Sequence, residues 1–148
     1  WVLTYDIAGL QADNSCISIT PDESPEWRDE QDLPEGRSMG SMIGLPDGRF
    51  VILEGVGSGT AGYGNTSWAR GQSFGDDPIL EPLYLDPEAP AGSRIYRTGM
   101  GAATVPRLYH STAILLPDGS VFTAGSNPNA DFVGPNAQNN PYPTEYRS

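Results

Sequence analysis

Short apolar runs separated by turn residues form the main pattern of this 148-residue chain. They are Val2–Leu3, Ile17–Ile19, Phe50–Leu53, Ala113–Leu116 and Val121–Ala124. No stretch repeats apolar residues at helical spacing over enough turns to predict a helix. Short runs punctuated by turns are typical of β-sandwiches and β-propellers. The sequence therefore predicts an all-β fold.

Two of these apolar regions surround the same turn, Leu-Pro-Asp-Gly, which begins at Leu45 and again at Leu116, 71 residues later. Asp-Gly between two apolar runs is a strong signal for a β-hairpin. A hairpin repeated at a long period favours propeller blades, and a kelch-type blade needs about 50 residues. The longer period leaves room for an insertion, which we place at Gly55–Gly75 because this stretch consists largely of turn and loop formers.

Two hairpins cannot close a propeller, which typically has four to eight blades. We therefore expect a fragment of about two to three blades. Its predicted parts are the outer part of a preceding blade with its connection (residues 1–36), a blade with a Gly-rich insertion loop (37–106) and a further blade (107–148).

Composition narrows the possible functions. The net charge of −11 argues against nucleic-acid binding, since phosphate contacts require a basic face. No apolar run approaches the roughly 18 residues that can span a bilayer. Asn65-Thr66-Ser67 is an N-glycosylation sequon on a predicted loop, which makes Asn65 a candidate glycosylation site.

Cys16 is the only cysteine of the chain and lies in the predicted strand Cys16–Ile19. Two interpretations stay open: a buried thiol, or half of a disulfide whose other cysteine lies outside this segment. A catalytic or metal-binding role is less favoured because no histidine or cysteine flanks this residue. The tryptophans Trp1, Trp27 and Trp68 are predicted to pack between blades, and Trp68 alone is considered for substrate contact.

Tyr109 and His110, the only histidine, stand directly before the second hairpin and have no counterpart in the first. A phenol oxygen and an imidazole nitrogen are good donors for a borderline metal such as Cu(II). Neighbours on a regular strand point to opposite faces, so a shared metal requires a bulge or a strand entrance at this point. The alternative is a core histidine beside a packed tyrosine.

The two copies of the hairpin also differ in the length of the segment that precedes the turn. Arg37 lies eight residues before Leu45, whereas Arg107 lies nine residues before Leu116. If the arginines correspond, the second copy carries one extra residue ahead of its first strand. We expect Arg107 to anchor the hairpin through backbone carbonyls.

Three segments surround the second hairpin: Arg107–Ser111, Leu115–Gly119 and Ala124–Asn129. Together they resemble the copper radical oxidases, glyoxal oxidase most closely and galactose oxidase more distantly. Further segments similar to that family occur in the same order: Trp27, Leu33–Arg37, Gly59–Gly64, Leu83–Pro87 and Tyr142–Arg147.

The resemblance implies a seven-bladed, kelch-like propeller with one copper near its axis. In that family two histidines, an axial tyrosine and a tyrosine cross-linked to a cysteine hold the metal, and the cross-linked tyrosine carries a radical. By position, Tyr109 matches the axial tyrosine, a metal ligand and candidate general base, and His110 matches the adjacent ligand. The resemblance places the cross-linked pair and the second histidine outside this segment, and Cys16 lies in the wrong segment to be that cysteine.

The function implied is a secreted, extracellular oxidase that converts small aldehydes such as glyoxal or methylglyoxal with O₂ to carboxylic acids and H₂O₂. The remaining blades of the parent protein are its expected partners, and the isolated fragment is expected to be inactive. One alternative is a galactose-oxidase-like alcohol oxidase with the same metal site. Another is a kelch-type propeller without redox chemistry that acts as a binding module. The glycine-rich insertion lacks the lysine and the helix of a phosphate loop, so we expect a loop at the propeller mouth, near the substrate.

Overall fold

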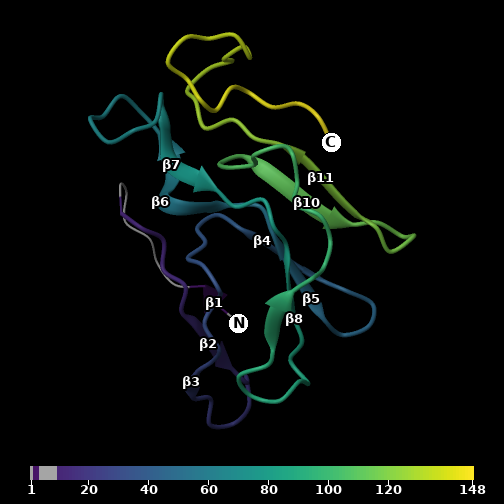
Figure 1. Ribbon diagram of the computed structural model, residues 1–148. Helices are drawn as coiled ribbons and strands as arrows, with labels where there is room; N and C mark the ends of the chain where they lie inside the picture. Colours follow the sequence, from purple (N-terminus) through teal and green to yellow (C-terminus); the bar gives the residue numbers. More distant parts are fainter. Residues whose placement is uncertain (1, 4–9) are drawn as a thin grey trace.

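A computed structural model describes residues 2–3 and 10–148, and there it contains β-strands, turns and irregular segments but no helix (Figure 1). The strands are β1 (Val2–Leu3), β2 (Cys16–Ile19), β3 (Trp27–Asp29), β4 (Ser41–Gly44), β5 (Phe50–Leu53), β6 (Val56–Tyr63), β7 (Ser73–Pro78), β8 (Leu83–Leu85), β9 (Ile95–Arg97), β10 (Ser111–Leu115) and β11 (Val121–Gly125). The all-β prediction is confirmed. No helix that could cross a membrane is found in this described part of the chain. Trp1 lies outside the described residues.

The strands form four antiparallel sheets, with the orders β1-β2-β3, β4-β5-β8-β9, β10-β11 and β6-β7. The predicted range 1–36 contains the first sheet, 37–106 contains the four-stranded sheet and the β6–β7 hairpin, and 107–148 contains β10–β11. The assignment of these sheets to propeller blades stays a prediction.

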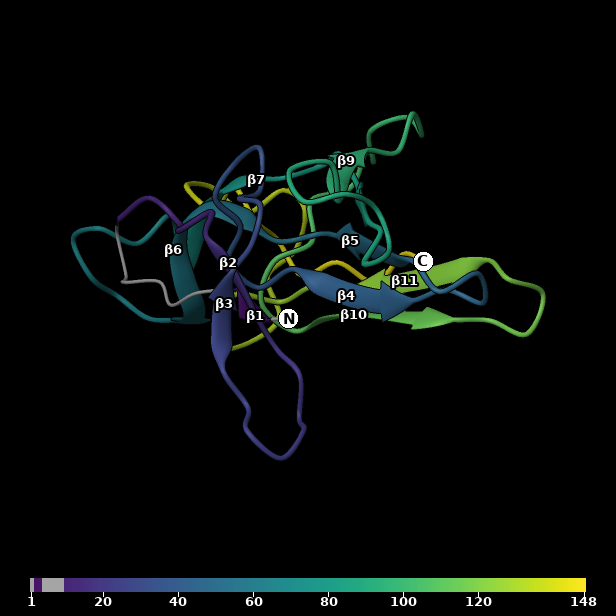
Figure 2. The same cartoon turned by 90° about the horizontal axis from the view of Figure 1, so that it is seen from below.

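Both predicted Asp-Gly hairpins are present. Leu45 N–H donates to the Arg49 carbonyl at 2.7 Å, and Leu116 N–H donates to the Ser120 carbonyl at 2.8 Å. The two turns place a glycine in the left-handed region, Gly48 at φ 87° and its counterpart 71 residues on at φ 84°. Glycine is the residue best suited to this backbone conformation. Figure 2 shows the hairpins side by side with their turns at the same end.

The repeat extends to rarer backbone positions. Met39 (φ 59°) and His110 (φ 65°) are 71 residues apart, and so are Glu54 (φ 61°) and Gly125 (φ 72°). A non-glycine residue in the left-handed region is uncommon. The repetition of both positions shows that the two hairpins share one backbone design at their entrances and exits.

The two arginines are equivalent. Arg37 Nη1 donates to the Glu54 carbonyl at 2.8 Å, and Arg107 Nη1 donates to the Gly125 carbonyl at 2.6 Å. The acceptors are 71 residues apart and the arginines 70, so the second copy has one extra residue before its strand, as the sequence indicated. Arg107 also donates to the carbonyl of Arg147 at 2.9 Å, which confirms its role as a backbone anchor.

The hydrophobic core joins the first sheet to the four-stranded sheet. Its buried members are Cys16, Leu33, Ile52, Leu83, Leu85 and Ile95, with Met42 and Phe50 packed against them. Cys16 is 2 % exposed, as a buried thiol requires, and burial raises its pKa to about 11. A thiol held in its neutral form is a poor nucleophile and a poor metal ligand.

The prediction of a loop at Gly55–Gly75 was wrong. Residues 56–63 and 73–78 pair as the hairpin β6–β7, with a register shift between Gly59 and Tyr63. A Cβ at Gly59 would lie 1.9 Å from the Phe74 carbonyl oxygen, so glycine permits the close approach of the two strands here. Glycine-rich composition therefore marked an irregular strand rather than the absence of one.

The β10–β11 sheet has one side turned to solvent. Ile114 and its cross-strand partner Phe122 are 57 % and 39 % exposed. Trp27 on β3 is also exposed, so nothing among the described residues covers this predicted packing aromatic. Trp68 contacts Phe74, with ring centroids 4.5 Å apart.

Candidate metal centre

Tyr109 and His110 form a turn directly before β10. Ser111 N–H donates to the Leu108 carbonyl at 3.3 Å, which closes the turn, and His110 adopts the left-handed conformation. Because the pair stands at the strand entrance and not within the strand, the alternation of side chains does not separate them. The two rings stack, with centroids 3.9 Å apart and an interplanar angle of 29°. Of the two arrangements that a shared metal requires, a bulge or a strand entrance, the structure shows the strand entrance.

One hydrogen bond determines which nitrogen of His110 is free. Nδ1 lies 3.1 Å from the carbonyl oxygen of Asn127. A carbonyl only accepts, so Nδ1 carries the proton and the lone pair is on Nε2. Metal-binding histidines in general are oriented by such a bond from their other nitrogen.

The acceptor residue is itself held in place. Asn127 N–H donates to the Tyr109 carbonyl at 2.8 Å, and the Asn127 side-chain oxygen accepts from Asn129 at 3.1 Å and from Thr144 at 3.0 Å. These contacts hold Asn127 in place, the residue whose carbonyl orients His110. The imidazole is partly preorganised by backbone and amide contacts.

A third aromatic ring comes from the insertion. Tyr63, at the end of β6, has its ring centroid 6.3 Å from that of Tyr109 and 6.4 Å from that of His110. Sequence reasoning did not single out this residue, although its position between Gly62 and Gly64 was visible. His110 is exposed and Tyr109 half-buried, so solvent reaches the pair.

The C-terminal segment lies beside the β6–β7 hairpin, as Figure 1 shows in yellow and teal, and hydrogen bonds join the two. The Tyr142 hydroxyl donates to Asp76, which also pairs with Arg70, and Ala130 N–H donates to Gln72 at 2.9 Å. Burial raises the pKa of Asp76, but the hydrogen bonds from Tyr142 and Arg70 outweigh it and hold that pKa below its ordinary value of 3.8.

These contacts predict that the attachment of the C-terminal segment to the β6–β7 hairpin weakens in acid. A carboxylate with a lowered folded-state pKa stabilises the native state above its ordinary pKa, and the contribution disappears as pH falls through the folded-state value. We expect hydrogen exchange of residues 140–147 in the full-length protein, corrected for intrinsic rates, to accelerate as pH falls from the ordinary pKa of 3.8 through the lower folded-state pKa of Asp76. Asp76→Asn should remove this pH dependence, and a variant that keeps it would show that another group controls the segment.

The donor set fits copper only in part. Phenol oxygen and imidazole nitrogen from adjacent residues suit Cu(II). Within the described ranges, no group of three or more His, Cys, Asp or Glu side chains is placed to hold a metal ion. Tyr109 and His110 therefore supply two donors toward such a centre, while Cys16 is buried in the core and Asn65 is exposed in the connection between β6 and β7.

The fold and the site together define an all-β protein with a preorganised tyrosine–histidine donor pair. The fold matches that of a solved fungal alcohol oxidase of the AA5 family in complex with copper, with a TM-score of 0.64 over 94 % of this chain and 25 % of that one. Sequence identity to it is 22 %, so this likeness concerns the fold alone.

The chain belongs to the glyoxal oxidase family of copper radical oxidases. The family described as glyoxal oxidase N-terminus matches residues 4–148. Aldehyde oxidase GLOX of Vitis pseudoreticulata is 43 % identical over 104 residues, covering 70 % of this chain and 18 % of that protein. Aldehyde oxidase GLOX1 of Arabidopsis thaliana is 35 % identical over 123 residues, covering 83 % and 17 %.

A WSC domain-containing protein of Arthroderma benhamiae is 39 % identical over 121 residues, which are 81 % of this chain and 12 % of that protein. The chain thus spans less than a fifth of the length of these curated relatives. The chain therefore corresponds to one segment of these longer proteins.

Proposed function

We propose that this chain is part of an extracellular copper radical oxidase, the parent protein, that oxidises small aldehydes of the glyoxal or methylglyoxal type. The reaction is aldehyde plus water plus O₂ to carboxylic acid plus H₂O₂. The observation that carries the proposal is the Tyr109–His110 turn, with stacked rings and a free Nε2. Family membership and the names of the aldehyde oxidase relatives support the aldehyde as substrate.

His110 and Tyr109 are assigned different roles. His110 offers Nε2 to the metal, held in direction by the Asn127 carbonyl. Tyr109 offers its hydroxyl oxygen, which we assign as ligand and as acceptor of the substrate proton. Copper supplies one-electron redox chemistry when bound. We expect the second histidine and the cross-linked tyrosine and cysteine on other parts of a seven-bladed, kelch-like propeller.

A galactose-oxidase-like alcohol oxidase is the second candidate, because the solved structure with this fold is an alcohol oxidase. Peroxide production by the copper-loaded parent protein separates the two, with methylglyoxal and galactose as substrates at equal concentration. Preference for the aldehyde is expected. Preference for the alcohol would support the second candidate, and no peroxide from either would favour a kelch-type binding module without redox chemistry.

Replacing Tyr109 tests the assignment of roles. Tyr109→Phe keeps the ring stack on His110 but removes the oxygen. Copper should be largely retained, since one weak ligand is lost, while kcat should fall by at least about 10²-fold, the usual scale for a general base. Copper stoichiometry and kcat in the parent protein measure the two effects.

The matched control is Tyr96→Phe, the same chemical change on β9, where the hydroxyl accepts from Arg49 Nη1 at 3.1 Å. Its kcat should equal that of the wild type. An unchanged kcat in Tyr109→Phe would remove this tyrosine from the mechanism.

Secretion remains a proposal with its own test. Asn65 is exposed in the connection between β6 and β7, as a glycan acceptor must be. We expect mass spectrometry of the parent protein from its native source to show a glycan on the peptide with Asn65. An unmodified Asn65 in every copy would contradict this site.

A further inference from the structure

Glu54 combines two unfavourable features. Its side chain is 5 % exposed, and its backbone lies in the left-handed region at φ 61°. The equivalent position of the second hairpin, Gly125, is occupied by the residue that this conformation favours. Burial of a carboxylate is also unfavourable unless partners compensate for the lost water, and accordingly burial raises the pKa of Glu54. A residue that is unfavourable in two ways requires a compensating role.

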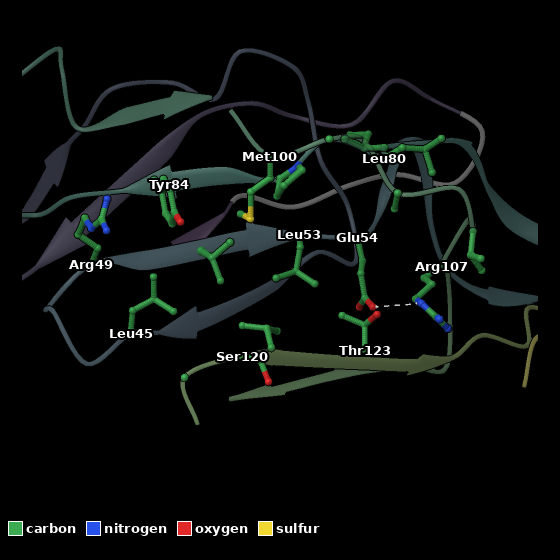
Figure 3. Close-up of a pocket in the computed structure, with 18 of the residues that line it drawn as sticks. Leu45, Arg49, Leu53, Glu54, Leu80, Tyr84, Met100, Arg107, Ser120 and Thr123 are labelled. Atoms are coloured by element: carbon green, nitrogen blue, oxygen red, sulfur yellow. Dashed lines mark ion pairs between the residues drawn. The ribbon is translucent and has the colours of Figure 1, made fainter. Parts of the chain in front are cut away.

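The partners of Glu54 lie on both hairpins. Ser41 Oγ on β4 and Ser111 Oγ on β10 each donate to Glu54 Oε2 at 3.2 Å. Arg107 Nε lies 3.8 Å from Glu54 Oε1, and Figure 3 shows the two side chains pointing toward each other. The next residue, Gly55, donates its N–H to the Arg107 carbonyl at 3.1 Å.

These contacts enclose the Tyr109–His110 turn from both sides. Arg107 stands two residues before Tyr109, and Ser111 directly follows His110. Glu54 and Gly55 therefore hold Arg107, ahead of the turn, by an ion pair and a backbone hydrogen bond. Glu54 also holds Ser111, after the turn, by accepting a hydrogen bond from its hydroxyl. The described residues offer no other carboxylate bonded to both flanks.

The surroundings strengthen these interactions. Glu54 and Arg107 lie at one end of a groove of about 780 Å³, whose other lining residues include Leu53, Leu80 and Met100 (Figure 3). Apolar walls lower the local dielectric constant, so charge–dipole contacts act more strongly there than in water. Glu54 Oε1 makes no hydrogen bond among the described residues, which leaves Oε2 and the ion pair to Arg107 as its attachments.

We propose that Glu54 is a positioning residue for the Tyr109–His110 pair, acting through Ser111 and Arg107. It holds the two ends of the turn so that the phenol oxygen and Nε2 face one metal ion. This inference rests on the proposed copper site and adds a residue from the first hairpin to it. Outer contacts of this kind typically change metal affinity by about 10–100-fold when they are removed.

The test uses the full-length protein and the variants Glu54→Gly and Glu54→Gln. Glycine suits φ 61° and should fold, yet it loses both attachments; we expect its Cu(II) dissociation constant to rise about 10-fold or more. Glutamine keeps an oxygen for Ser111 and should recover most of the affinity. The Cu(II) electron paramagnetic resonance spectrum should change in the glycine variant and resemble the wild type in the glutamine variant.

A matched carboxylate serves as control. Glu30, directly after β3, also accepts from a serine, Ser18, at 2.6 Å and pairs with an arginine, Arg94, at 2.6 Å. Glu30→Gln should leave the copper dissociation constant and spectrum unchanged. Ser111→Ala should weaken copper binding more than Ser41→Ala, although each removes one bond to the same oxygen.

Several results would overturn the inference: unchanged affinity in Glu54→Gly, no recovery in Glu54→Gln, or an equal loss in Glu30→Gln. A wild-type parent protein that binds no copper would contradict the proposed function instead. In that case hydrogen exchange of the metal-free protein still tests Glu54, because residues 108–111 should exchange faster in Glu54→Gly and not in Glu30→Gln. Equal exchange in all three proteins would refute the positioning role.

Discussion

His110→Ala in the full-length protein is expected to abolish peroxide formation. The variant removes the only nitrogen donor that this segment offers to copper, and it removes the ring on which Tyr109 stacks. Loss of a direct ligand should weaken Cu(II) binding by more than about 100-fold, beyond the effect typical of outer contacts. Copper titration against a competing chelator and a peroxide assay with methylglyoxal measure the two effects.

The backbone at His110 requires its own control, because alanine is strained at φ 65°. Met39→Ala also places an alanine in the left-handed region, at the equivalent position of the first hairpin (φ 59°), where no metal ligand is proposed. It should keep copper and activity. His110→Asn tolerates the left-handed backbone and should still lose both. Full copper content and full activity in His110→Ala would refute the metal assignment.

Residues 1–148 expressed alone are expected to show no cooperative unfolding transition and to make no peroxide. The β10–β11 sheet has only two strands, and an isolated two-stranded hairpin is marginally stable at best. Its outer side exposes Ile114 and Phe122, and Trp27 is exposed on β3. Apolar faces and free strand edges of this kind promote association.

Thermal unfolding followed by near-ultraviolet circular dichroism, with ultracentrifugation to establish the monomer, measures this prediction. We expect a sloping signal or aggregation and weak copper binding, because Tyr109 and His110 are two of the four protein ligands expected for the complete copper site. The full-length protein serves as the reference and should unfold in a sharp transition. Cooperative unfolding of the monomeric 148-residue chain would show that it is an independent domain.

Features that depend on neighbouring residues could be predicted from the sequence. The Asp-Gly turns, the strand that begins at Cys16 and the strand entrance at Tyr109 depend on neighbouring residues, since turn type and side-chain alternation act over a few positions. The extra residue after Arg107 was visible as a spacing, and the common role of the two arginines was confirmed by their equivalent carbonyl acceptors.

The pairing of strands that lie far apart in the sequence could not be predicted from the sequence. The insertion was predicted to be a loop because it consists largely of turn and loop formers, yet β6 pairs with β7, and Gly59 permits the close approach of their backbones. The strand Leu83–Leu85 was too short to stand out, and its identity depends on pairing with β5 and β9. Composition describes a residue's preference, but the sheet partner decides its structure.

The sequence alone thus determined the all-β class, the repeated hairpins and the resemblance carried by the tyrosine and histidine, because these depend on local patterns. Only the tertiary structure brought Tyr63 to within 6.4 Å of His110, directed its Nδ1 to Asn127 and joined Glu54 to Ser111. Glu54 and Ser111 are 57 residues apart in the chain. Contacts over such separations follow from the packing of two hairpins against each other, which no local pattern encodes.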